Sequence, residues 1–354
     1  MADGFSVNTG ELRGFSQALR GLGGHTIDRA TAYAKQYFTM PKLDDGVLFH
    51  SATSALSGLN QAVAAYLHEL DTALLASATE LDKQAALYDK TDAAHAAALD
   101  ATYQSHYSPV CLPLVYGPIA APDSFFDAAP SADVPENLVS KVLNGDWTGL
   151  TGTLATIINM IFDKDPLAEV GRGFSGNWHD VEQASGAAGA LHDFLMCEAE
   201  HIQTAFGAIR SWSGNAYLDA QAFFTDFASQ IESAATELDQ ATSSLSMVAV
   251  GMESAATLAG SFFGKAMDYA MAGAVEMALE PIADTNIFSA IADNAALAVT
   301  IGLATDAAKT AIEAVDDVNK YKNTLTVIIT VANEFNSTFG TLPRPAGFDS
   351  PLVK

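Results

Sequence analysis

Side chains of the types that bind metal ions gather in one short segment of the sequence. His192, Cys197, Glu198 and His201 fall on a single predicted helix. Glu198 and His201 are one turn apart and could share a metal ion, whereas Cys197 points to another side of the helix. Because a single pair does not complete a metal site, the favoured interpretation is a solvated helix face that holds no metal.

The sequence contains no signature of a known catalytic centre. It has no Gly-x-Ser-x-Gly turn, no His-Glu-x-x-His motif and no phosphate-binding loop. Gly171, Gly173 and Gly176 match the pattern Gly-x-Gly-x-x-Gly, but a dinucleotide site requires a preceding β-strand. Pro166 and a helix-like segment precede these glycines instead. We therefore expect a protein that is not an enzyme and that uses no cofactor.

Two short motifs combine an aromatic residue with a polar residue or glycine. Tyr88 and Asp92 are spaced i, i+4 and so share one face of a helix. Trp212 and Gly214 fall where two long predicted helices reverse, and glycine supplies the backbone freedom of such a turn. Either motif could serve only the fold, with Trp212 closing one end of a bundle. A second Trp-x-Gly, which starts at Trp147, precedes no long helix, and we assign it no function.

The composition sets the class of the protein. The 354 residues are enough for about two domains. They include 42 acidic residues against 17 Lys and Arg, so the net charge is −25. This sign opposes binding to nucleic acid or to an anionic membrane surface. Hydrophobic residues make up 49% of the chain, and many of them are alanine, which favours a folded, all-α protein.

The sequence carries little sign of a leader peptide or a membrane anchor. The first residues include no basic segment followed by an apolar one, so we expect export, if any, by a route that does not use a general secretory signal. The apolar stretch 147–162 is shorter than the roughly 20 residues that span a bilayer, and we expect no stable membrane span. The two cysteines, Cys111 and Cys197, could form one disulfide.

Helical periodicity organises the chain into two hairpins. In the first, Asn8 and Glu11 resemble a capping box, a helix is predicted to run to about Phe38, and a second follows a turn at 41–46. In the second hairpin, one helix covers about 177–210 and the next continues beyond the Trp212 turn. Both second helices carry apolar stripes with alternating steps of 3 and 4, typical of a coiled-coil seam. The stripes are Leu56, Leu59, Val63, Tyr66, Leu70, Ala73 and Ser77, and Phe224, Phe227, Ile231, Ala234, Leu238, Ala241, Leu245, Val248 and Met252.

These patterns divide the chain into four parts. Residues 1–105 form the first hairpin, 106–168 a Pro-rich linker with short helices, 169–280 the hairpin with the Trp-x-Gly turn, and 281–354 a C-terminal helical region and tail. One hairpin alone buries little apolar surface, so we expect the two to pack as a four-helix bundle. In antiparallel packing, the turn of one hairpin lies beside the open end of the other, which would bring Trp212 and Gly214 near Tyr88 and Asp92.

The motifs resemble those of proteins linked to ESX (type VII) secretion. The first half, with Phe5, Tyr88 and Asp92, is similar to the EspC-like family over residues 5–105. The second half resembles the EspA-like partners, which carry a Trp-x-Gly turn, over residues 170–280, and the two are joined in one chain as in EspB-like proteins. The resemblance implies that Tyr-x-x-x-Asp is an export signal and that Trp-x-Gly is a recognised turn.

We therefore expect a substrate or accessory component of an ESX system. The resemblance implies that it folds in the cytoplasm, is recognised by an ATPase or chaperone of that machinery, and reaches the outside or the cell surface. A second interpretation is a self-assembling or membrane-active helical protein, because apolar segments occur at 287–305 and 325–331, and a second copy of the chain would then be its partner. A third, the targeting half of a toxin, is disfavoured because no cargo domain follows.

Overall fold

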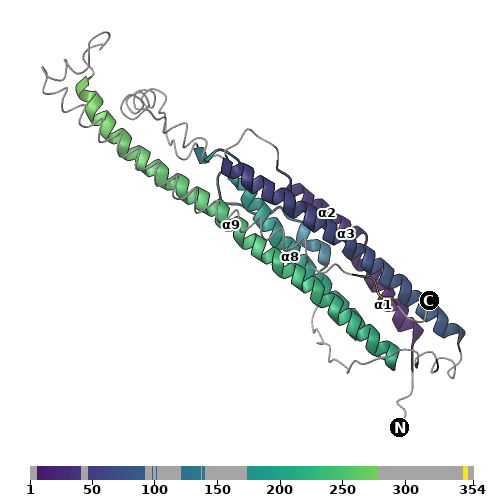
Figure 1. Cartoon of the computed structure of the whole chain (residues 1–354). Coiled ribbons are helices and arrows are strands. Elements are labelled where there is room, and N and C mark those ends of the chain that lie inside the picture. Colours follow the sequence, from purple (N-terminus) through teal and green to yellow (C-terminus); the bar gives the residue numbers. More distant parts are fainter. Residues whose placement is uncertain are drawn as a thin grey trace.

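The described part of the computed structural model is an all-α protein (Figure 1). The structure describes residues 6–40, 47–91, 98, 101, 121–136, 138–139, 174–277 and 346–349. Within these ranges the helices are α1 (Thr9–Leu22), α2 (His25–Phe38), α3 (Val47–Lys90), α8 (Trp178–Gly207) and α9 (Asn215–Met277), with a short 3₁₀ helix, η1 (Pro122–Phe126). These residues contain no β-strand, only an isolated bridge between Ser6 and Ser213. The predicted fold class is confirmed.

Two helical hairpins pack side by side as a four-helix bundle. α1 and α2 follow each other along α3, and α8 runs along α9. α1 and α2 also contact α8, which joins the first hairpin to the second. Figure 1 shows the helices of both hairpins lying nearly parallel to one long axis. This is the arrangement expected when two amphipathic hairpins bury their apolar faces together.

The first helix is interrupted, contrary to the prediction that it runs unbroken to about Phe38. α1 ends at Leu22 and α2 begins at His25. Gly24 between them has a φ angle of 61°, a left-handed conformation that glycine adopts without strain. Its N–H donates a hydrogen bond of 2.6 Å to Oδ1 of Asp71 on α3. The break redirects the chain and is fixed by this contact with the neighbouring helix.

The predicted apolar stripes form the core. Every residue of the two stripes is buried, including Ser77, which is completely inaccessible to solvent. On α1, the residues spaced three and four apart are buried as well, namely Leu12, Phe15, Leu19 and Leu22. The 3–4 spacing therefore identified the faces that pack, as expected for helices that bury one stripe each.

The end of the bundle where α3 and α8 begin is closed by aromatic side chains. The rings of Phe49 and Trp178 meet edge to face with centroids 5.4 Å apart, and Trp178 is fully buried. Its indole N–H donates to the carbonyl oxygen of Phe174 at 3.3 Å. Gly176 lies against the ring of Phe49 with a φ angle of 123°. A Trp residue therefore closes this end, although sequence analysis singled out only Trp147 and Trp212.

Part of the Pro-rich connection is packed into the bundle. The ring of Phe126 in η1 lies between Tyr33 of α2 and Phe194 of α8, with centroid distances of 4.9 and 5.2 Å. The carboxylate of Glu182 on α8 accepts hydrogen bonds from the N–H groups of Asp133 and Val134 at 2.6 and 2.7 Å. The connection therefore bridges the two hairpins as well as joining them along the chain.

The second helix of the second hairpin, α9, extends beyond the other described helices. α9 has 63 residues, about 95 Å at 1.5 Å per residue, against about 45 Å for the 30 residues of α8. Figure 1 shows its C-terminal half continuing past the start of α8. None of the helices described by the structure has an apolar stretch that could cross a membrane. Asp92, Cys111, Trp147 and the predicted helical region at 306–339 lie outside the described residues.

Candidate functional site

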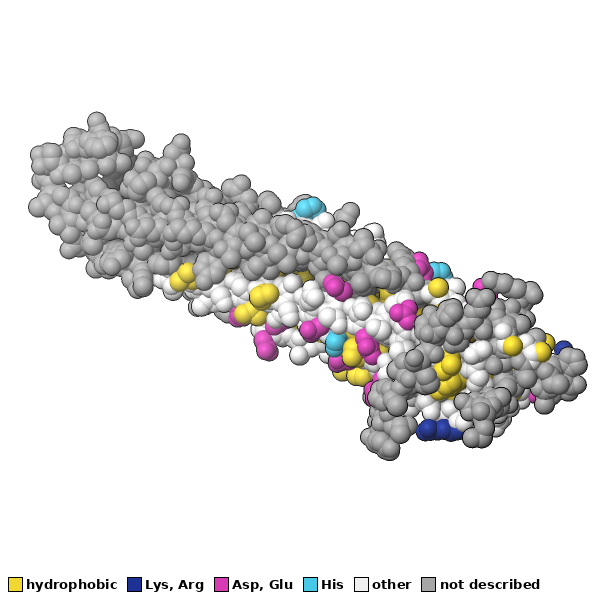
Figure 2. Space-filling view, turned by 60° about the horizontal axis from the view of Figure 1, so that its bottom comes forward, with side chains coloured by type: hydrophobic (Ala, Val, Ile, Leu, Met, Phe, Trp, Pro, Cys, Tyr) yellow, Lys and Arg dark blue, Asp and Glu magenta, His cyan; other side chains and the backbone are white. Residues whose placement is uncertain are grey.

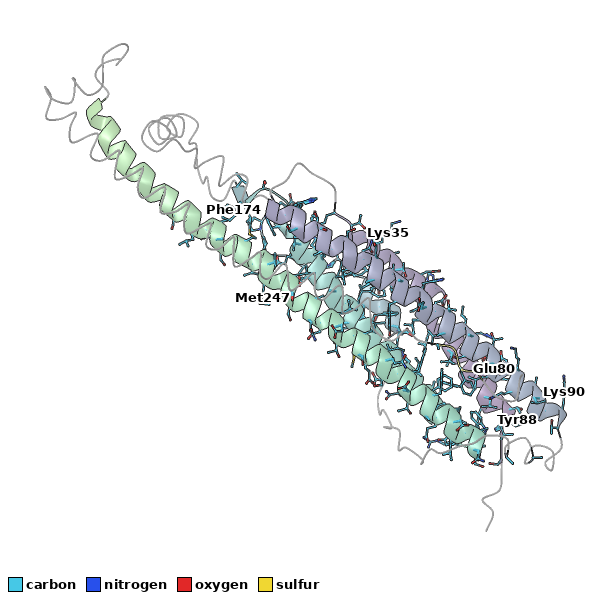
Figure 3. The ribbon with its side chains drawn as sticks, in the orientation of Figure 1. Lys35, Glu80, Tyr88, Lys90, Phe174 and Met247 are labelled. Carbon is cyan, nitrogen blue, oxygen red and sulfur yellow. The ribbon has the colours of Figure 1, made fainter. Side chains whose placement is uncertain are left out.

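The two motifs singled out in the sequence lie at the same end of the bundle. Tyr88 is in the last turn of α3, and Trp212 and Gly214 form the turn between α8 and α9. Ser6 and the first residues of α1 contact the neighbours of both motifs. Figure 3 shows Tyr88 at the end where α1 and α9 begin. The packing expected from the sequence, in which a turn lies beside an open hairpin end, is the packing observed.

On the first side of this end, α1 is joined to the end of α3. The hydroxyl of Thr9 donates a hydrogen bond of 2.7 Å to Oδ1 of Asp89. The guanidinium group of Arg13 donates to Oδ2 of the same carboxylate. These hydrogen bonds, that from Arg13 above all, hold the pKa of Asp89 below its usual value. Asp89, the residue after Tyr88, is therefore occupied in fixing α3 to α1.

On the second side, α1 is joined to the turn between α8 and α9 through Glu11. Its Oε2 accepts hydrogen bonds from the backbone N–H groups of Arg210 and Ser211, both at 2.9 Å. Its Oε1 accepts from the hydroxyl of Ser211 at 3.1 Å. These bonds, chiefly that from the N–H of Ser211, lower the pKa of Glu11. One carboxylate thus satisfies two N–H groups of the turn.

The expected capping box is only half formed. Asn8 caps α1 as predicted, because its side-chain oxygen accepts a hydrogen bond of 2.9 Å from the N–H of Gly10. The carboxylate of Glu11 instead reaches across to Arg210 and Ser211. The N–H groups of the turn lie outside any helix and need a hydrogen-bond acceptor. The spacing of Asn8 and Glu11 in the sequence cannot predict that Glu11 supplies this acceptor.

Ser6 adds a second connection between the N-terminal segment and the turn. The N–H of Ser213 donates to the carbonyl oxygen of Ser6 at 2.9 Å, and the N–H of Ser6 donates to Oγ of Ser213 at 3.1 Å. The hydroxyl of Ser6 donates to the carbonyl oxygen of Ser211 at 3.0 Å. We call Ser6, Glu11, Ser211 and Ser213, together with Thr9, Arg13 and Asp89, the end clamp. Sequence analysis identified none of these pairings.

The aromatic residues of both motifs lie inside the bundle. Tyr88 is 5% exposed and Trp212 is 3% exposed. The ring of Trp212 meets that of Tyr217 edge to face, with centroids 5.9 Å apart. Its indole N–H is buried and has no hydrogen-bond partner among the described residues. Among the described residues, the polar groups around these rings are therefore more accessible than the rings themselves.

Gly214 fits the role expected of it. Its φ angle is 106°, in the region that residues with a side chain rarely adopt. Its carbonyl oxygen accepts the first hydrogen bond of α9, from the N–H of Leu218 at 3.2 Å. The Trp-x-Gly turn therefore needs glycine in order to begin the long helix where it does.

The residue types that bind metals do not converge. His192 Nδ1 lies 2.9 Å from the carbonyl oxygen of Ala235, and Cys197 Sγ lies 3.5 Å from His201 Nδ1. No group of three potential ligands occurs among the described residues. Cys197 is a buried thiol, and its pKa is raised to about 11, chiefly by burial. Glu198 is completely buried within the α8 core face.

The visible face of the described helices carries mainly acidic charge. In Figure 2, acidic side chains stand along the strip formed by these helices, and Lys and Arg appear mainly near one end. This distribution agrees with the net charge of −25. The acidic side chains on the visible part of this face oppose the binding of an anionic partner there.

We expect Glu11→Gln to loosen the connection between α1 and the turn. The amide oxygen is a weaker acceptor than the carboxylate, so the N–H groups of Arg210 and Ser211 should exchange with solvent several-fold faster. Because the pKa of Glu11 is lowered in the folded state, this connection stabilises the protein above pH 4.5 and is lost as the pH falls through the lowered pKa. Hydrogen exchange read at these two amides measures the effect.

The control for this variant is Glu237→Gln on α9, about six turns beyond Gly214. It removes the same charge at a distance from the turn and should leave exchange at Arg210 and Ser211 unchanged. Equal acceleration in both variants would show that Glu11 acts through net charge and not through its hydrogen bonds.

Comparisons with protein-family models, with curated proteins and with solved structures return no match for this chain.

Proposed function

We propose that this protein is a secreted substrate or accessory component of an ESX (type VII) secretion system and is exported as a folded helical bundle. The observation that carries the proposal is that the Tyr88 end of α3 and the Trp212 turn are joined at one end of the bundle by the same N-terminal segment. The resemblance of these motifs to export signals supplies the functional assignment.

The end clamp supports a signal that depends on folding. Tyr88 and Trp212 are 124 positions apart in the sequence, in different hairpins. They lie at the same end of the bundle, where α1 contacts the end of α3 through Asp89 and the turn through Glu11. A receptor that contacts both sides of this end would bind the docked hairpins and not the unfolded chain. Export would then select chains that have folded.

The burial of the two rings defines how such a receptor makes contact. Since Tyr88 and Trp212 are nearly inaccessible, the receptor contacts the polar groups around them. Arg13 and Asp89 have side chains that are each 43% exposed, and Ser211 is exposed as well. We assign these exposed groups to recognition and the rings to holding them in position.

The proposal is tested by export of Tyr88→Ala. Removing the ring leaves a cavity beneath the end clamp and should shift its polar groups. We expect the ratio of protein in culture filtrate to protein in cells to fall about tenfold or more, the size of effect typical when a central recognition feature is truncated. Immunoblots of both fractions from a strain with the ESX system measure the ratio.

Leu81→Ala is the matched control, because a loss of export could also follow from instability. Leu81 is fully buried on the same face of α3, two turns before Tyr88, and its truncation costs about 2–5 kcal/mol. It should lower the thermal midpoint to a similar degree and leave export near the wild-type level. Wild-type export of Tyr88→Ala, or an equal loss in both variants, would contradict the assignment of this end as a signal.

A further inference from the structure

A short segment near the C-terminus is seated between the two hairpins. Residues 346–349 have no regular secondary structure, yet Phe348 is only 7% exposed and belongs to the core. Its partners are Ser77 on α3 and two phenylalanines on α9, more than 120 positions away in the sequence. The site that Phe348 occupies is therefore formed by one helix from each hairpin. We call this site, lined by Ser77 of α3 and by Phe223 and Phe224 of α9, the seat.

The wall of the seat is aromatic. The ring of Phe348 lies 5.2 Å from that of Phe223 and 5.6 Å from that of Phe224, measured between centroids. Phe224 in turn meets Phe15 of α1 edge to face at 4.7 Å. The seated ring thus joins an aromatic cluster that already connects the first hairpin to the second, and such pairs add to the free energy gained by burial alone.

The floor of the seat contains a hydrogen-bond acceptor. The N–H of Phe348 donates to Oγ of Ser77 at 2.8 Å. Ser77 is fully buried on the face of α3 that packs into the bundle. A buried hydroxyl group is costly without a partner. The seated backbone supplies this partner, so Ser77 is suited to receive a peptide N–H.

The surface of α3 beneath the seat also restricts which residue can precede Phe348. A Cβ atom placed on Gly347 would lie 2.7 Å from Cβ of Ala76 and 3.6 Å from the carbonyl oxygen of Ala73. The first distance is shorter than side chains tolerate, and the opposing atom belongs to a short side chain that cannot move aside. The seat therefore fits glycine followed by phenylalanine and rejects larger residues at the first position.

The same face of α3 offers another acceptor one turn further on. Glu80 follows Ser77 by three positions, and its side chain is 10% exposed. Its Oε2 contacts Lys83 at 3.4 Å, while its Oε1 is buried and has no hydrogen-bond partner among the described residues. Figure 3 places Glu80 on the half of α3 that leads to Tyr88. A peptide backbone in the groove could donate to this oxygen.

We propose that the groove between α3 and α9 is a binding site for a short peptide that carries a Gly-Phe step, and that residues 346–349 of this chain are its resident occupant. Ser77 accepts the peptide N–H, Ala76 selects glycine, and Phe223 and Phe224 hold the ring. Because the occupant contacts both hairpins, it fastens them together at the level of the aromatic cluster. This proposal is independent of the assignment to an export system.

The test supplies the peptide separately to a full-length chain whose own segment is displaced. Gly347→Val introduces the clash with Ala76 and should empty the seat. The probe is a fluorescently labelled peptide with the sequence of residues 343–351. We expect its anisotropy titration to give an affinity about tenfold or more higher for this variant than for the wild type, whose tethered segment competes at high effective concentration.

Matched peptides report specificity. The same peptide with Phe348→Ala, or with Gly347→Val, should bind this variant about tenfold or more weakly. Adding Ser77→Ala to the protein should also weaken binding of the unaltered peptide. If Gly347→Val does not fold by circular dichroism, the full chain with Phe348→Ala is the second host. The proposal is overturned if a folded host does not bind the peptide, or if the Gly and Val peptides bind equally well.

Discussion

Glu198→Gln raises the thermal midpoint of unfolding at pH 7, which is the expected result of removing a carboxyl group from the core. Glu198 is completely buried on α8, and neither of its oxygens has a hydrogen-bond partner among the described residues. Burial therefore raises its pKa well above the usual 4.5. The amide variant carries no charge in either state, so folding no longer requires a carboxylate to take up a proton.

The pH dependence identifies this cause. Because the pKa is raised in the folded state, the folded protein holds a proton that the unfolded chain releases above about pH 4.5. The stability of the wild type therefore falls as the pH rises from 4.5 toward the raised pKa. We expect the variant to gain about 2–8 °C at pH 7 and little at pH 4.5, because taking up the proton costs about 1.4 kcal/mol for each pH unit above the usual pKa.

Glu200→Gln is the matched control on the same helix. Glu200 follows Glu198 by two positions and is partly exposed. Its replacement should change the midpoint little at either pH, as is usual for surface substitutions. Calorimetry of the three proteins at pH 4.5 and 7 provides the measurement. A gain from Glu198→Gln that is the same at both pH values would contradict the explanation by protonation.

Gly176→Ala should destabilise the opposite end of the bundle strongly. Gly176 has a φ angle of 123°, and a Cβ atom there would lie 2.2 Å from Cγ of Phe49. Phe49 is 2% exposed and packs on the fully buried Trp178, so its ring has little room to move. Overpacking and an unfavourable φ angle cost about 1–3 kcal/mol each. We expect a loss of roughly 2–6 kcal/mol in chemical denaturation.

Two further variants show whether the clash with Phe49 is the cause. Gly14→Ala on α1, where no atom lies within 4 Å of the added Cβ, should be neutral or stabilise the helix by up to about 1 kcal/mol. Adding Gly176→Ala to Phe49→Ala should cost less than adding it to the wild type, since the opposing ring is gone. An equal cost in both backgrounds would assign the loss to backbone strain alone.

The architecture of the helices followed from the sequence because it depends on local patterns. The stripes of α3 and α9 repeat with a period that only a helix buries on one side, and every predicted stripe residue is buried. The Trp212 turn was predictable for the same reason, since it interrupts a periodic pattern and contains glycine. These features need no knowledge of distant parts of the chain.

The features that the sequence did not predict depend on contacts between distant residues. The break at Gly24 is held by Asp71, and Glu11 leaves its expected cap for the N–H groups of Arg210 and Ser211. The seat of Phe348 joins Ser77 to α9, and Phe348 itself lies outside any periodic pattern. An Asn-x-x-Glu spacing is the same whether the Glu carboxylate caps its own helix or binds a distant turn. The spacing alone therefore does not decide between these two hydrogen-bonding patterns.

The length of α9 relative to the width of the bundle would matter if the protein is exported in the folded state, as proposed. A helix with its side chains is about 10–12 Å across, so two layers of two helices measure about 20–25 Å in cross-section, whereas α9 alone runs about 95 Å. Under the proposed export function, a conduit that accepted the described helices end first would need an opening of at least this cross-section. The end clamp and the C-terminal half of α9 lie at opposite ends of the described helices (Figure 1). Under the proposed function, entry by the clamped end would fix the direction in which the molecule travels.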